Sequence, residues 1–164
     1  MLFHFVKLVL VFILATVCHW AFSSFFAMWG ISVNLLLVFV IALCTCCKPR
    51  TGYPFAFFCG LFLDFFSTKL FGYNAFSFTL AALLVYSVSD QLYFEELPSQ
   101  MIATFCLTFL VSITNNALVM LLAASTIWAG WYNVFFGALF GTLVAPLVFA
   151  LVFRLFGKRE AGIV

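Results

Sequence analysis

A single acidic residue, Asp64, lies within the apolar runs of this 164-residue chain, and it is the first candidate for chemistry. A carboxylate in hydrocarbon is costly, so an ionisable residue in such a run indicates a functional site by default. Asp64 stands just before a turn, where its oxygens can accept N–H groups at the start of the next helix or pair with Lys69. A proton relay needs several titratable groups along a path, which the run lacks. We predict a structural hydrogen-bonding role, with a partner or ligand contact as the open alternative.

Residues for a metal site or a catalytic group are scarce. Cys44, Cys46 and Cys47 cluster at the end of one apolar run, whereas His4 and His19 lie on another. A zinc site would need these ligands at matching depth. No nucleophile stands beside a base, and there is no glycine-rich phosphate loop and no pair of carboxylates. The sequence predicts no catalytic activity, no metal and no cofactor.

Four polar residues recur at helical spacing in the fifth apolar run: Thr104, Thr108, Ser112 and Asn115. Intervals of four, four and three residues place them on one face of a helix. Such a stripe favours hydrogen bonds between helices inside the fold. A polar pocket for a small molecule is the alternative.

Small residues recur in the sixth run at Gly137, Gly141 and Ala145. A face of small residues lets two helices approach closely. The neighbour could be another helix of this chain or the transmembrane helix of a partner, and the pattern leaves both open. Pro146 follows directly and predicts a kink in this helix.

Composition shows that the solvent of this chain is lipid. Hydrophobic residues make up 67% of it and charged residues 7%, against about 25% charged in soluble domains. A soluble enzyme, a nucleic-acid binder and a disordered tail are excluded. Six spans of roughly 20 residues would use about 120 residues, which leaves no room for an extramembrane domain. The predicted class is an all-α integral membrane protein with six transmembrane helices in one compact bundle.

Polar breaks divide the chain into six predicted spans: 2–22, 31–47, 53–66, 73–88, 101–124 and 133–156. The third is the shortest, at about 21 Å, so the turn after it is expected close to the boundary of the hydrocarbon. With the N-terminus in the cytoplasm, Lys69 is the one basic residue of seven on the outer side. The four tryptophans then lie near the outer interface, where indoles settle. Both termini are predicted to be cytoplasmic.

Residues 49–86, PRTGYPFAFFCGLFLDFFSTKLFGYNAFSFTLAALLVY, resemble the hallmark segment of the bacterial rod shape-determining MreD family. In that family a glycine and an aspartate four residues apart close one span, a short turn ends in a glycine, and a span rich in small residues follows. The matching positions are Gly60, Asp64, Gly72 and Ala75. Asn34 and Pro146 resemble two further family positions. The acidic loop between the fourth and fifth spans departs from the family pattern.

The resemblance implies a non-catalytic scaffold of the cell-elongation machinery in the bacterial inner membrane. The partners it implies are an MreC-like protein with one transmembrane helix and, indirectly, MreB-like filaments and a RodA-like synthase with its transpeptidase. Membrane lipid would surround the protein, and nucleic acid would play no part. The family is also similar in fold to the substrate-binding S components of energy-coupling-factor transporters. The alternative is therefore a subunit of a vitamin importer, whose pocket would draw on Asn74, Ser112, Asn115 and Asn116. A toxin-immunity or holin-like protein matches the composition but not the hallmark segment.

Overall fold

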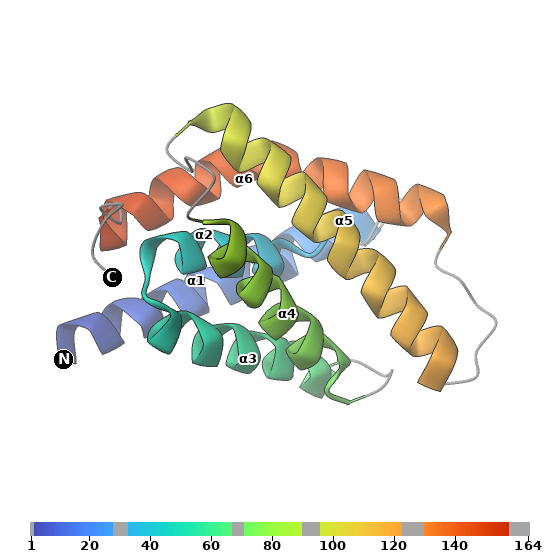
Figure 1. The fold of residues 1–164 in the computed structure, drawn as a ribbon, viewed down its shortest axis with the longest axis horizontal. Helices are drawn as coiled ribbons and strands as arrows, with labels where there is room; N and C mark the ends of the chain where they lie inside the picture. The colour runs from blue at the N-terminus through green and yellow to red at the C-terminus, as the bar shows by residue number, and fades with distance from the viewer. Residues whose placement is uncertain (1, 28–32, 67–70, 90–95, 123–129, 158–164) are drawn as a thin grey trace.

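The computed structural model describes residues 2–27, 33–66, 71–89, 96–122 and 130–157 (Figure 1). These residues form six helices and no strand. The helices are α1 (Leu2–Ala27), α2 (Leu35–Cys46), α3 (Pro49–Phe66), α4 (Tyr73–Val88), α5 (Leu97–Leu122) and α6 (Trp131–Phe156).

The third helix begins earlier than the sequence suggested. It starts at Pro49, four residues before the predicted span, whereas α4 has the predicted bounds. Proline is favoured in the first turn of a helix because its missing N–H would have no partner there. The backbone N–H groups of Thr51 and Gly52 both donate to the Lys48 carbonyl and complete that turn. With 18 residues, α3 is about 27 Å long, whereas the span predicted from the sequence is about 21 Å long.

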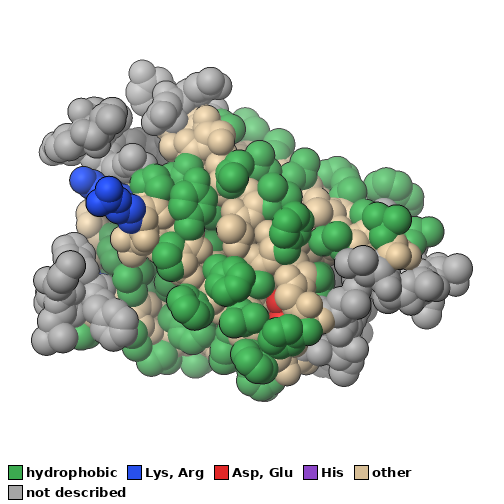
Figure 2. Space-filling view, turned by 60° about the horizontal axis from the view of Figure 1, so that its bottom comes forward, with side chains coloured by type: hydrophobic (Ala, Val, Ile, Leu, Met, Phe, Trp, Pro, Cys, Tyr) green, Lys and Arg blue, Asp and Glu red, His purple; other side chains and the backbone are tan. Residues whose placement is uncertain are grey.

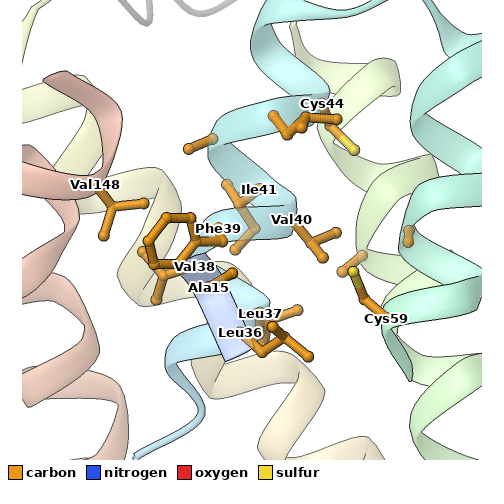
Figure 3. Close-up of a cluster of buried hydrophobic side chains, with 14 of the residues drawn as sticks. Ala15, Leu36, Leu37, Val38, Phe39, Val40, Ile41, Cys44, Cys59 and Val148 are labelled. Atoms are coloured by element: carbon orange, nitrogen blue, oxygen red, sulfur yellow. The ribbon is translucent and has the colours of Figure 1, made fainter. Parts of the chain in front are cut away.

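The shortest helix is α2, and it forms the centre of the molecule. Its 12 residues extend about 18 Å, less than the ~30 Å of a hydrocarbon core. Every residue from Leu35 to Thr45 is buried, as expected for a helix that is apolar on all sides. Figure 3 shows side chains of α2 pointing toward several neighbouring helices, with Val148 on one side and Cys59 on another. The other helices therefore shield α2 from lipid.

Five helices surround α2. The pairs α3–α4, α4–α5 and α5–α6 are in contact, and α1 packs against α2 and α6. The ring of Phe12 on α1 also meets Phe55 and Phe62 of α3 edge-on, at centroid distances of 6.5 and 5.2 Å. Thus α1 fills the place between α6 and α3 and completes the enclosure of α2.

The outer surface is apolar over most of the face in Figure 2. Among the described residues, three helices are long and apolar enough to cross a membrane, over Val6–Phe26, Leu97–Leu118 and Trp131–Phe156. Large exposed side chains such as Leu143 and Leu147 would be unfavourable in water but suit contact with lipid tails. The fold is therefore the one expected for a small all-α membrane protein.

Charge separates the two ends of the bundle. The starts of α1, α3 and α5 and the ends of α2, α4 and α6 lie together (Figure 1). We call this the basic end, because Lys7, Lys48, Arg50 and Arg154 all belong to it. The Lys7 ammonium group donates to the Leu155 carbonyl at 2.6 Å and so ties α1 to the last turn of α6. We call the opposite end, where α3 stops and α4 starts, the Asp64 end.

Candidate functional site

The carboxylate of Asp64 caps the start of α4. Asp64 is only 2% exposed. Its Oδ1 accepts the backbone N–H of Asn74 at 3.1 Å, and its Oδ2 accepts that of Ala75 at 3.0 Å. These N–H groups belong to the first turn of α4 and have no partner inside the helix, and a negative group at this position also interacts favourably with the helix dipole. This is the contact predicted from the sequence. The alternative partner, Lys69, lies outside the described residues.

Gly60 allows α3 to approach the start of α4 at backbone distance. A Cβ atom at Gly60 would lie 2.5 Å from the Ala75 Cα and 2.5 Å from the Asn74 carbonyl oxygen. Gly60 is four residues before Asp64, so the two share one face of α3. The close approach therefore brings the Asp64 carboxylate within reach of the N–H groups that it accepts.

Gly72 turns the chain into α4. Its φ of 94° lies in the left-handed region, which residues with a Cβ atom rarely adopt. Its carbonyl accepts the N–H of Phe76 at 3.0 Å, the first bond of the helix. Gly60, Asp64 and Gly72 thus act together on one junction between two helices.

The small-residue face of α3 extends beyond the Gly60–Asp64 pair toward the start of the helix. Gly52, Ala56, Gly60 and Asp64 follow one another at intervals of four, and all four residues are buried. A Cβ at Gly52 would overlap the Tyr86 hydroxyl, which itself donates to the Cys47 carbonyl at 3.2 Å. The helices α3 and α4 are therefore in close contact at both ends. The four-residue interval was the available signal, but Gly52 had been assigned to a polar break.

A short polar network continues from α4 to α5. Asn115 donates from its Nδ2 to the Asn74 Oδ1 at 3.5 Å, and its Oδ1 accepts the hydroxyl of Ser77. Asn74 and Ser77 are buried and lie three residues apart on one face of α4. Since the backbone of Asn74 also donates to Asp64, the network joins α3, α4 and α5. Ser77 was not identified from the sequence, where a lone serine in an apolar run gives no specific signal.

The polar stripe of α5 is used differently from the prediction. Asn115 does bond to another helix, but the Thr108 hydroxyl donates to the Thr104 carbonyl of its own helix at 2.6 Å. The Thr104 hydroxyl is buried without a hydrogen-bond partner. The prediction of interhelical bonds along the whole stripe is therefore wrong. The reason is local, because a threonine hydroxyl reaches the carbonyl four residues earlier more readily than a group on a neighbouring helix.

The small residues of α6 face the interior. Gly141 and Ala145 are buried, whereas Gly137 is half-buried. A Cβ at Gly141 would lie 3.6 Å from Val38 of α2 and 4.0 Å from Thr108 of α5. Of the two alternatives, the face therefore packs against helices of this chain. At Gly141 and Ala145 the interior of the fold leaves no room for a partner's transmembrane helix, whereas docking at Gly137 stays a prediction.

The two remaining positions implied by the resemblance have no assigned contact. Asn34 precedes α2, and its Oδ1 is buried without a hydrogen-bond partner. Pro146 lies inside α6, which continues to Phe156. The kink at Pro146 and the family role of Asn34 stay predictions.

The site holds helices together and has few groups for chemistry. Both oxygens of Asp64 are engaged with backbone N–H groups. Within the described part of the chain, no group of three or more His, Cys, Asp or Glu residues could hold a metal ion. What the arrangement can do is fix the relative positions of α3, α4 and α5.

Comparison with known proteins identifies one relationship. The family model described as rod shape-determining protein MreD matches residues 1–159. No curated protein and no solved structure matches the chain. The matched range contains every residue of the Asp64 site.

Proposed function

Because the chain belongs to the rod shape-determining protein MreD family and so has a role in rod shape determination, we propose that it is a non-catalytic scaffold of the cell-elongation machinery. Its place would be the bacterial inner membrane. The observation that carries the proposal is the Asp64 site, where the buried carboxylate accepts two backbone N–H groups. A carboxylate used in this way stabilises a helix junction, as a scaffold requires.

The proposed partner is an MreC-like protein with one transmembrane helix. Nearly all of the described residues are helical. Contacts with a partner would therefore involve the helix surfaces in the bilayer or the short connecting segments. Through this partner the chain would act with MreB-like filaments and a RodA-like synthase and its transpeptidase, and so support peptidoglycan synthesis.

Co-purification tests the scaffold proposal. The tagged chain is co-expressed with the MreC-like protein of the same organism and purified in mild detergent. We expect the MreC-like protein to be retained, and an unrelated single-span protein expressed at the same level to be lost. Equal recovery of the two proteins would contradict the proposed function.

We propose that the chain crosses the membrane six times and that the basic end faces the cytoplasm. The four described basic residues at this end fit the tendency of Lys and Arg to remain inside. Trp131, 65% exposed, begins α6 at the other end, where an interfacial indole is expected. Trp29 and Trp128 lie outside the described residues. We predict that reporter fusions after Lys69 and after Arg159 report opposite sides of the membrane. The same side for both fusions would disprove this topology.

A second prediction concerns catalysis. The purified chain, without synthase partners, is expected to leave lipid-linked wall precursors unchanged over hours, because its sequence places no nucleophile beside a base. The assay follows the precursors by chromatography, with a RodA-like synthase as the positive control. Turnover by the chain alone that a single substitution removes would show that it is an enzyme.

A further inference from the structure

The second half of α5 carries polar side chains away from the enclosed part of the molecule. We call Ser112–Leu121 the α5 end segment. None of its described side chains is buried, whereas the first half of α5 has buried side chains up to Val111. Figure 1 shows α5 and α6 diverging toward the Asp64 end. Asn115 links this segment to α4, Ser112–Leu118 are half-buried, and Met120 and Leu121 are exposed.

Two residues of the α5 end segment have unused hydrogen-bonding groups. Asn116 donates from its Nδ2 to the Ser112 carbonyl at 2.8 Å. The Asn116 carboxamide oxygen and the Ser112 hydroxyl bond to no other described residue. Both residues lie in the apolar span Leu97–Leu118. Since hydrocarbon offers neither donors nor acceptors, groups at this depth are stabilised by a polar partner.

The two residues also continue an existing helix-packing ridge. Thr104, Thr108, Ser112 and Asn116 follow one another at intervals of four, so they form one ridge along α5. The first two are buried, and Thr108 lies against Gly141 of α6. The ridge therefore runs from an internal helix contact into the half-buried part of the α5 end segment. Its half-buried residues, Ser112 and Asn116, have the same spacing as its buried residues.

On the basis of the scaffold function proposed above, we infer that the α5 end segment receives the partner's single transmembrane helix. The ridge at Ser112 and Asn116 would pack against that helix. A polar side chain of the partner, or a backbone group that has no hydrogen-bond partner within its own helix, would bond to the Asn116 oxygen and the Ser112 hydroxyl. A lipid tail cannot make these bonds, whereas a transmembrane helix that carries a polar group can. The partner helix is therefore expected to carry Ser, Thr, Asn, Gln or Trp at the level of Asn116.

Substitution of Asn116 tests the inference in the co-purification assay with the full chain. Asn116→Leu is expected to lower the retained partner about fivefold per folded chain, the loss of roughly 1 kcal/mol of helix–helix hydrogen bonding. Asn116→Gln keeps the amide and is expected to restore most of the retention. The matched control is Thr114→Val on the same helix, because the Thr114 hydroxyl already bonds to the Leu110 carbonyl at 2.8 Å. Asn116→Leu with wild-type retention would overturn the inference.

Photo-crosslinking gives a second measurement that does not depend on Asn116. A benzophenone amino acid is placed at Met120, one turn after Asn116, or at Leu147 on α6, which is 74% exposed. Crosslinks to the partner are expected from position 120 and not from 147. Crosslinks from 147 alone, or from 120 only to a second copy of this chain, would overturn the inference. If the wild-type chain retains no partner, the proposed function fails as well, whereas retention without these effects rejects the docking site alone.

Discussion

Replacing Asp64 with leucine is expected to remove most of the folded protein from the membrane and to round the cells. The substitution leaves the N–H groups of Asn74 and Ala75 without acceptors at a buried helix start. A hydrogen bond to a charged group contributes about 1.5–3 kcal/mol, and two such bonds are a large part of a net stability of about 5–15 kcal/mol. We expect the folded level to fall about tenfold or more. The measurements are the amount of folded protein in the membrane and the cell shape after replacement of the wild-type gene.

Asp64→Asn is the matched variant for this prediction. Asparagine keeps one acceptor oxygen of similar geometry, so it can retain one of the two bonds at reduced strength. We expect an intermediate folded level and partial rod shape. If Asn is as damaging as Leu while both variants accumulate normally, the negative charge itself is required. Asp64 would then act through an ion pair with a partner or through proton transfer, and not by capping α4.

Gly60→Ala is expected to be nearly as damaging, although it adds a single methyl group. The new Cβ would stand 2.5 Å from backbone atoms of Asn74 and Ala75, which cannot move without shifting α4. Overpacking of this kind typically costs about 1–3 kcal/mol, and it also displaces the N–H groups from Asp64. The measurement is the thermal midpoint of the purified protein in detergent, which we expect to fall.

Gly141→Ala is the control for this second prediction. Its Cβ would meet the Val38 side chain at 3.6 Å, an ordinary contact distance. Because alanine is favoured over glycine in a helix by about 1 kcal/mol, the midpoint is expected to stay the same or to rise. Equal destabilisation by both substitutions would mean that α3 and α4 are not in backbone contact at Gly60.

Features set by local chemistry could be predicted from the sequence, whereas the enclosure of α2 by the other helices could not. The cap by Asp64 follows from a carboxylate placed before a turn, and the bounds of α4 follow from Gly72 and the polar residues after Val88. No comparable signal in the sequence indicates the central position of α2. A helix that is apolar on all sides has the same pattern whether protein or lipid surrounds it.

The same limit explains why the pattern of α6 left two interpretations open and why the prediction for α5 was wrong. Intervals of four residues show that Gly141 and Ala145 share a face, but they do not tell which helix lies opposite. Likewise, the spacing of Thr104 and Thr108 places their hydroxyls on one side, but whether Thr108 bonds across a helix contact depends on its neighbour. That neighbour is Gly141, which has no side chain to offer.

The central claim is that the chain holds a partner in the membrane and that Asp64 acts by maintaining the fold. The most direct test is the amount of MreC-like protein retained per folded chain, measured for the wild type and for Asp64→Asn. The scaffold account predicts the same ratio for both, because Asn lowers the number of folded chains but not the partner-binding surface of each. A wild-type chain that retains no partner, or folded Asp64→Asn chains that retain none, would contradict it.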